Sequence, residues 1–213
     1  MDEKESPQTE RCRGPSTNKT EQTRKKIIAA ALDVFMDQGF SDARVADICK
    51  KAGVAKGSMY NYFQTKESLF ESVLQEFIAT ARIELQSGHR QQNETIKQYL
   101  KRVLLPVMQT LESSGRAQIA RLVIVESDRF PSLAEAYVRE VHQPLIDALR
   151  PLLEIALQEG ELRNDGIVRY PHLLLASNWI GMIHNGMLRA SSPLNLGELF
   201  EIGLDTFFDD PKK

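Results

Sequence analysis

The sequence has little cysteine and no long apolar run, and both absences limit what the protein can be. Two of its 213 residues are cysteine, which is too few for a disulfide framework and typical of a reducing compartment. No uninterrupted apolar stretch reaches the roughly 18 residues of a membrane span, and the polar N-terminus lacks the apolar core of a signal peptide. We therefore expect a soluble, cytoplasmic protein.

Motifs of catalysis and metal binding are also lacking. The four histidines are scattered along the chain, and none has the two-histidine spacing of a zinc site on one helix. No glycine-rich phosphate loop follows a strand, and no serine or cysteine nucleophile has an evident general base. The sequence thus predicts no catalytic residue, no metal and no cofactor. An enzyme is kept as an alternative to the function developed below.

The charge is balanced overall but unevenly distributed. A net charge of −2 argues against a wholly basic nucleic-acid binder. Residues 19–70 nevertheless carry nine Lys and Arg against six Asp and Glu, while the rest of the chain is acidic on balance. This asymmetry is typical of a DNA-binding head on a neutral or acidic body.

Helical periodicity accounts for nearly all of the chain after a polar tail, residues 1–18, whose composition predicts disorder. Apolar residues recur every three or four positions. Thr20 and Thr65 are the expected caps of the first and fourth helices, and Gly39 and Gly53 the expected terminators of the first and second. The expected helices cover about 20–38, 45–52, 56–63, 65–81, 94–112, 115–127, 131–159, 167–189 and 196–208.

No strand-like alternation competes with these helices, so the predicted fold class is all-α. Prolines are expected to disturb two of the helices: Pro106 should interrupt the one over 94–112, and Pro144 and Pro151 should kink the one over 131–159. Cys49 falls on an apolar helical face, where a small buried thiol is expected.

Residues 53–69 read GVAKGSMYNYFQTKESL, a stretch that combines aromatic rings with lysines. On a helical wheel of 100° per residue, Met59 and Phe63 lie on one face, which is expected to pack against the core. The opposite face carries small and hydrogen-bonding groups flanked by two phenols: Gly57, Ser58, Asn61, Tyr60 and Tyr62. The stretch therefore predicts a short helix that presents this second face to a partner.

That face suits contact with DNA. Gly57 lets the backbone approach closely, and Ser58 with the free amides of the first turn can hold a phosphate. Asn61 has the paired donor and acceptor that read adenine in the major groove, while the tyrosines, Lys56 and Lys66 suit phosphates. Two short helices joined by a tight turn, the second exposing this face, form a helix-turn-helix. The alternative is a helical corner with surface tyrosines.

From Thr23 to Leu69 the chain resembles the DNA-binding domain of the TetR/AcrR family of bacterial regulators, whose members are homodimeric repressors. The matching positions are Ile28, Ala31, Phe35, Gly39, Phe40, Val45, Ile48, Ala52-Gly53-Val54, Lys56-Gly57-Ser58, Tyr60, Tyr62-Phe63, Lys66 and Leu69. The resemblance implies that DNA is contacted by Lys56, Ser58, Tyr60, Asn61, Tyr62 and Lys66.

The start of the second helix departs from the family pattern. Ala43 and Arg44 stand where Thr and then Ser or Thr are usual, so the usual cap and hydroxyl contact with phosphate are lost. Arg44 can keep a phosphate contact through its charge. The cap is then expected from Ser41 or Asp42.

Two further departures lie near the expected reading face. Ala55 removes a common side-chain cap of the recognition helix, and Ala46 is too short to reach a base edge. Sequence reading should therefore depend more heavily on Asn61 and Tyr60.

Residues 115–165 resemble the C-terminal domain of the AefR-like branch of the same family, on the stretch RLVIVESDRFPSLAEAYVREVHQPLIDAL with GELR after it. The resemblance implies a helical bundle that binds a small, mostly apolar effector and dimerises through its last two long helices. Apolar residues wrap most of the helix over 167–189, which independently favours a dimer. Ser177, Gly181 and Gly186 offer small positions where another helix can cross. The alternative is a monomer core.

The candidate ligand-binding residues are apolar, aromatic or hydrogen-bonding side chains of the body: Met108, Phe130, Tyr137, Asn178, Trp179, Met182 and His184. At helical spacing Trp179 and Met182 also suit a simple core. A histidine within an apolar helix, such as His184, also suits a hydrogen-bonded core position.

The sequence therefore predicts a disordered tail (1–18), a helix-turn-helix domain (19–66) and a ligand-binding and dimerisation domain (67–213). The expected partners are double-stranded DNA with a roughly palindromic operator, a second copy of the chain and a small organic effector, but no membrane. The predicted function is a dimeric, sequence-specific transcriptional repressor released by that effector. The alternatives are a helical small-molecule-binding or partner-binding protein, or an enzyme, without regulatory DNA binding.

Overall fold

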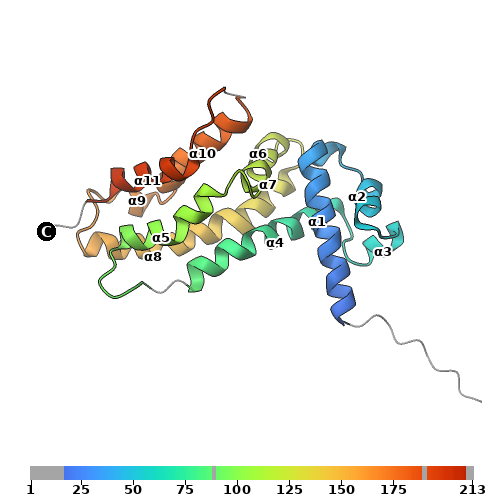
Figure 1. The fold of residues 1–213 in the computed structure, drawn as a ribbon, viewed down its shortest axis with the longest axis horizontal. Helices are drawn as coiled ribbons and strands as arrows, with labels where there is room; N and C mark the ends of the chain where they lie inside the picture. The colour runs from blue at the N-terminus through green and yellow to red at the C-terminus, as the bar shows by residue number, and fades with distance from the viewer. Residues whose placement is uncertain (1–16, 88–89, 189–190, 210–213) are drawn as a thin grey trace, which may run out of the picture.

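The computed structural model describes residues 17–87, 90–188 and 191–209 of the chain (Figure 1). In these ranges the structure has helices, no named strand, and one isolated antiparallel bridge between Leu162 and Phe208. The predicted all-α fold class is confirmed. None of the described helices is both long and apolar enough to cross a membrane.

A small head lies at one end of the molecule and a larger helical body extends from it (Figure 1). The head consists of α1 (Thr17–Asp42), α2 (Val45–Ala52) and α3 (Lys56–Tyr60). The body consists of α4 (Lys66–Ser87), α5 (Ile96–Gln109), α6 (Arg116–Glu126), α7 (Pro131–Tyr137), the π-helix η1 (Val138–His142), α8 (Gln143–Gln158), α9 (Gly166–Arg169), α10 (Leu173–Gly186) and α11 (Leu196–Phe207). Every expected helix has a counterpart, but the single helix expected over 167–189 is divided into α9 and α10 by residues 170–172, which are not helical.

Gly39 interrupts α1 near the position predicted for its end. Its φ of 79° and ψ of 171° lie in a region that is essentially restricted to glycine, so the helix bends there before its last residues. The helix begins at Thr17, and the predicted cap at Thr20 is wrong because Asn18 and Lys19 already belong to the helix. Residues 1–16 of the expected disordered tail lie outside the described residues.

The caps of the two short helices follow from the side chains available. Arg44 is the N-cap residue of α2 and makes no capping hydrogen bond, so the predicted caps from Ser41 and Asp42 are wrong. Gly53 closes α2 in the left-handed conformation with a φ of 68°, as predicted. Ala55 precedes α3 without a side-chain cap, since a methyl group cannot accept a hydrogen bond.

Thr65 caps α4, as predicted. Its hydroxyl oxygen accepts from the Ser68 amide at 3.0 Å, and the Ser68 hydroxyl oxygen accepts from the Thr65 amide at 3.2 Å. These reciprocal bonds satisfy amides that a helix start leaves free. The helix extends to Ser87, beyond the predicted end near Ala81.

Prolines affect the body helices less than expected. The predicted interruption at Pro106 is wrong, because α5 continues through it to Gln109 with the proline exposed. α8 likewise continues through Pro151. Just before Pro144 the helix widens into the π-helix η1. Pro144 has no N–H to donate to the carbonyl oxygen of Glu140, four residues earlier, so the regular α-helical hydrogen bond cannot form there.

One hydrophobic core joins the head to the nearest body helices. The rings of Phe35, Phe40 and Phe70 lie 5.4–5.6 Å apart. Buried side chains of α6 and α7 complete this core: Ile119, Leu122, Val123, Leu133 and Ala136. A second core fills the far end between α5, α8, α10 and α11. The head therefore rests on packing that it shares with the body.

Candidate nucleic-acid interface

The exposed face of α3 is fixed by two buried side chains. Met59 and Phe63 are 0% and 3% exposed and belong to the head core. The other residues of α3, with Asn61 directly after it, are all exposed: Lys56, Gly57, Ser58, Tyr60 and Asn61. The orientation predicted from the helical wheel is confirmed, while the contact of this face with DNA stays a prediction.

The end of α3 differs from the expected regular helix. The helix stops at Tyr60, and Asn61 is its C-terminal cap. The amides of Tyr62 and Phe63 then both bond to the Met59 carbonyl oxygen, at 2.9 and 3.0 Å. Tyr62 is half-buried against the head core, with its ring centroid 6.4 Å from that of Phe63. It therefore flanks the exposed face less freely than Tyr60.

Lys66 faces the protein, which argues against its predicted phosphate contact. Its ammonium donates to three carbonyl oxygens: those of Phe40 (2.6 Å), Ser41 (3.2 Å) and Ala43 (3.1 Å). An ammonium has three donor hydrogens, so none is left for DNA in this arrangement. Burial lowers the pKa of Lys66, partly offset by nearby carboxylates such as Glu67.

Arg44 and Arg24 complete the basic side of the head. Arg44 is exposed directly before α2, where a phosphate contact remains open to it. Arg24 lies over the Phe63 ring, 5.6 Å from its centroid, and donates to the Ser72 hydroxyl at 3.2 Å. This link between α1, the end of α3 and α4 was not predicted, because a lone arginine on a helix gives no signal of its distant partners.

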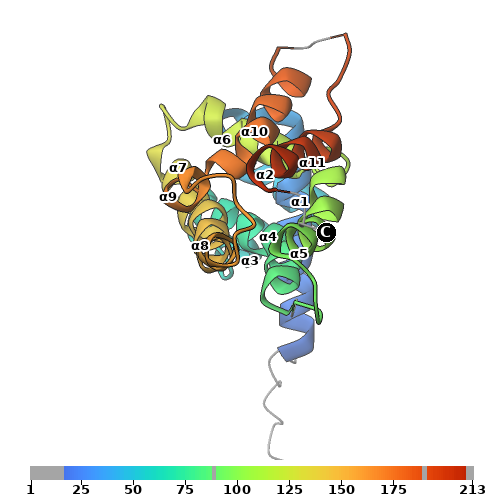
Figure 2. The same cartoon turned by 90° about the vertical axis from the view of Figure 1, so that its left-hand side faces the viewer.

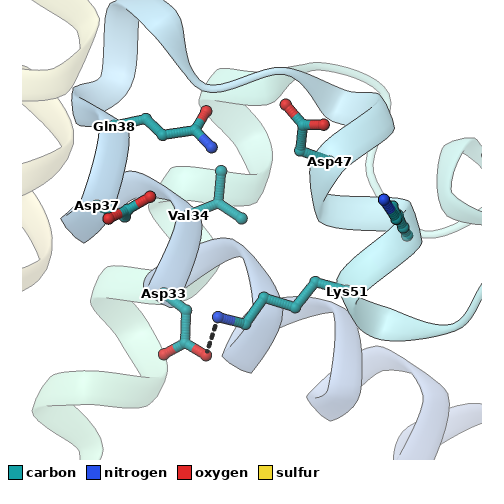
Figure 3. A pocket seen from close by; sticks show the side chains of 7 residues that line it. Asp33, Val34, Asp37, Gln38, Asp47 and Lys51 are labelled. Carbon is teal, nitrogen blue, oxygen red and sulfur yellow. Dashed lines mark ion pairs between the residues drawn. The ribbon is translucent and has the colours of Figure 1, made fainter.

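A notch between α1 and α2 lies elsewhere on the head (Figure 3). Its lining mixes both signs of charge: Asp33, Val34, Asp37, Gln38, Asp47, Lys50 and Lys51. Lys51 pairs with Asp33 at 2.9 Å across the notch. Among the described residues no group of three or more His, Cys, Asp or Glu could hold a metal ion.

Comparison with known proteins places this head and body in one family. The sequence model described as "Bacterial regulatory proteins, tetR family" matches residues 27–73, and the model of the AefR-like transcriptional repressor C-terminal domain matches residues 98–169. Together the two matches cover more than half of the chain. The chain belongs to the TetR family.

Relatives of this TetR-family protein are themselves regulators by name. The chain is 37% identical over 86 residues to the uncharacterized HTH-type transcriptional regulator YdgC of Bacillus subtilis, covering 40% of this chain and 44% of YdgC. It is 24% identical over 147 residues to UidR of Escherichia coli K12, covering 67% of this chain and 70% of UidR. The chain thus matches less than half the length of YdgC.

Solved structures share the fold over most of the TetR-family chain. GusR of Salmonella enterica superposes with a TM-score of 0.67 at 22% identity, covering 87% of this chain and 94% of GusR. FadR of Bacillus subtilis, in complex with stearoyl-CoA, superposes with a TM-score of 0.66 at 23% identity, covering 85% and 95%. At such identities the likeness shows the fold alone.

Three of the candidate ligand-binding residues of the TetR-family body lie together. Tyr137 and Trp179 meet edge to face with centroids 6.0 Å apart, and both pack against a small core that contains Met182. Burial raises the pKa of the Tyr137 hydroxyl. Asn178, 2% exposed, donates to the Leu196 carbonyl at 2.7 Å, while its Oδ1 has no hydrogen-bond partner among the described residues.

The remaining candidates, Phe130, His184 and Met108, lie apart from the group of Tyr137, Trp179 and Met182. Phe130 packs edge to face on Phe40 with centroids 5.1 Å apart, so it joins head to body. The ring Nε2 of His184 lies 3.1 Å from the Ser192 carbonyl oxygen and holds the segment after α10. Met108, a residue of α5, is buried in the second core at the far end of the body. These side chains are already committed to packing or hydrogen bonds, which spacing along the sequence could not reveal.

An exposed apolar surface lies on α10 and α11, which pack side by side along one side of the body (Figures 1 and 2). Its exposed residues are Leu173, Ile180, Met187, Leu188 and Ile202, with Ile180 63% exposed. Leu173, Ile180 and Met187 recur every seven residues, so they share one side of the helix. The sequence predicted this apolar surplus for a dimer.

The small residues of α10 face inward instead. The Ser177 hydroxyl donates to the Leu199 carbonyl at 3.2 Å, and a Cβ on Gly181 would overlap the side chains of Leu196 and Leu199. A Cβ on Gly186 would overlap Arg121 of α6. The close crossings are therefore with α11 and α6 of the same chain.

Proposed function

We propose that this chain is a homodimeric transcriptional repressor that reads a roughly palindromic operator with the exposed face of α3. The proposal rests on one observation: Met59 anchors α3 so that Gly57, Ser58 and Asn61 all face outward. A glycine for close approach, a hydroxyl near the helix start and an amide further on combine phosphate contact with base reading.

The DNA contacts divide by chemistry. Asn61 reads a base, and Tyr60 contributes beside it. Arg44, Lys56 and Ser58 contact phosphates, with Tyr62 at the flank. Lys66 is not among the proposed DNA contacts, because its ammonium donates to three carbonyl oxygens within the head.

The proposed units are a DNA-binding domain over residues 19–66 and a ligand-binding and dimerisation domain over 67–213, acting in the cytoplasm and without catalytic activity. The exposed apolar stripe of α10 supports dimerisation through α10 and α11. A two-fold axis through that face gives two copies of α3, which meet half-sites about one helical turn (~34–36 Å) apart.

Selection of bound duplexes from a random pool tests this function. A repressor of this kind enriches a two-fold symmetric motif, and the complex contains an even number of chains. Recovery of no motif would contradict the proposal and favour a partner-binding bundle. A motif without symmetry would contradict the dimeric reading.

The proposed effector is a small, largely apolar molecule that enters the body beside Trp179. Tyr137, Trp179 and Met182 supply apolar and aromatic surface, and the unpartnered Asn178 Oδ1 supplies an acceptor for a donor group. A ligand that prefers the dimer unable to bind DNA weakens DNA binding by its differential affinity for the two states. The DNA weakens ligand binding by the same factor.

Trp179 is the only tryptophan in the chain, so its fluorescence reports binding in the body. Stearoyl-CoA, which is present in the FadR structure, and free fatty acids are the first probes. The expected result is weaker binding of the probe when the selected duplex is present. Equal affinity with and without duplex, for every compound that binds, would contradict regulated release.

A further inference from the structure

Helix α6 is buried on two sides, toward the head and toward α10. Its large apolar residues, Ile119, Leu122 and Val123, belong to the head core. Its small residues, Ala117 and Ala120, pack in the core that contains Met182 of α10. A helix with two buried faces cannot move against one neighbour without disturbing the other.

Arg121 fixes α6 to the body. Its guanidinium donates to the Met182 carbonyl oxygen at 3.1 Å and pairs with both carboxylate oxygens of Glu112, at 2.9 and 3.0 Å. The absence of a side chain at Gly186 leaves the space through which Arg121 passes. The planar fork of arginine gives this bond a defined geometry.

Two other side chains bind α6 to the head, on either side of the bend at Gly39. Gln118 Nε2 donates to the Met36 carbonyl oxygen at 2.7 Å, and Glu126 Oε1 accepts from the Ser41 amide at 3.0 Å. In a regular helix these backbone groups would pair four residues along the chain. Gly39 has non-helical backbone angles, and side chains of α6 bind these two backbone groups beside it.

We propose that Gln118 and Glu126 are positioning residues that couple the body to the DNA-binding head. They hold the end of α1. Arg44, three residues after Ser41, directly precedes α2. A displacement of α6 by the body shifts this corner, and with it the helix against which α3 is seated. The effect on DNA rests on the proposed function, while the effect on the corner itself does not.

Hydrogen exchange in the free, full-length protein tests the coupling without DNA. In Glu126→Ala, the amides of residues 41–53 are expected to exchange about tenfold faster, since a charge-assisted bond that restrains local opening is lost. Amides of α10 should keep their rates. Glu126→Gln keeps an acceptor oxygen and should restore most of the protection, and Glu135→Ala, a matched truncation at an exposed site on α7, should change nothing.

Unchanged exchange in Glu126→Ala, or an equal rise throughout the protein, would overturn the proposal. The DNA measurement then adds a second, independent criterion. The double variant Gln118→Ala/Glu126→Ala should bind the selected duplex about five- to tenfold more weakly while remaining folded, with the salt dependence of binding unchanged because every phosphate contact is intact.

The two proposals fail in different ways. If the wild-type protein and Glu135→Ala bind no duplex selectively, the proposed function is wrong, and the exchange rates alone decide on the coupling. If both bind and the double variant binds equally well, the function stands and the coupling is wrong. An altered salt dependence in the double variant would mean that the α6 residues act by contacting DNA or by reshaping the whole head, which also contradicts positioning.

Discussion

Lys66 donates to the carbonyl oxygen of Phe40 at 2.6 Å, and the same ammonium lies 4.5 Å from the centroid of the Phe40 ring. The first residue of α4 is thereby bound to the corner between α1 and α2. Glu126 binds the same corner from α6 through the Ser41 amide, and Arg129 donates to the Ser41 hydroxyl at 2.8 Å. Side chains of α4, of α6 and of the turn after α6 thus meet at one short segment.

Replacement of Lys66 by methionine should lower the free energy of unfolding by about 2 kcal/mol, because three carbonyl oxygens lose a charged donor. The salt dependence of DNA binding should stay the same. Lys56→Met is the matched control: Lys56 is exposed, so stability should hold while the salt slope falls by about one. Urea denaturation and binding at several salt concentrations measure both. The opposite pattern would restore Lys66 as the phosphate contact.

Gly39→Ala should lower the free energy of unfolding by about 1–3 kcal/mol, the usual cost of a side chain in this backbone region. The added Cβ would also stand 3.1 Å from Glu126 Oε1. Gly57→Ala is the comparison, since no atom lies within 4 Å of its added Cβ and alanine favours a helix. It should keep or slightly raise stability in urea denaturation. Equal losses in the two variants would contradict this account.

Asn61→Ala should weaken binding to the selected duplex by about 1–3 kcal/mol and relax the preference at one base pair, as expected of a lost bidentate contact. Gln64→Ala truncates an exposed amide side chain just beyond α3 and should leave that preference unchanged. Binding to duplexes randomised at each position in turn measures the effect. A uniform loss on all sequences would make Asn61 a phosphate contact instead.

The elements of the head were predictable because their causes are local. Met59 and Phe63 are four residues apart and both buried, and Gly53 and Thr65 end and begin helices through their own backbone and side chain. Periodicity and capping chemistry read such features directly. The family resemblance added the function of the exposed face.

The contacts that bind the head to the body were not predictable, because their partners are distant in sequence. Ser41 and Glu126 are 85 residues apart, and Gln118 and Met36 are 82 apart. Lys66 was assigned to DNA because its charge is visible in the sequence but its burial is not. Phe130 was assigned to a ligand site because its packing partner is not visible in the sequence: only the fold brings its ring against Phe40.

Ile180→Glu should convert the dimer to a monomer at micromolar concentration, because the buried charge in an apolar interface has no partner. Leu157→Glu is the control: Leu157 is 41% exposed and Ile180 63%, but Leu157 lies on α8 and is not part of the α10 stripe. The control should stay dimeric in sedimentation experiments. A wild-type monomer would contradict the dimer, and a dimeric Ile180→Glu would move the interface elsewhere.

The start of α5 carries an ion pair whose contribution to stability should depend on pH. Glu94 accepts from Arg102 Nε and Nη2 at 2.7 and 2.8 Å, and from the Gln91 amide at 2.9 Å. These bonds, of which those from the Arg102 side chain have the largest effect, lower the pKa of Glu94 from 4.5 to about 2. A lowered carboxyl pKa means that the folded state binds protons less readily than the unfolded state, so this stabilisation is lost as the pH falls.

The difference in unfolding free energy between the wild type and Arg102→Ala should therefore be full above pH 4.5 and shrink toward pH 2, the range set by the two pKa values of Glu94. Urea denaturation of both proteins at pH 7, 4 and 3 measures that difference. Arg150→Ala removes another exposed arginine, on α8, and should differ from the wild type by the same amount at each pH. A difference for Arg102→Ala that stayed constant from pH 7 to 3 would show that Arg102 stabilises the protein by packing rather than through the carboxylate of Glu94.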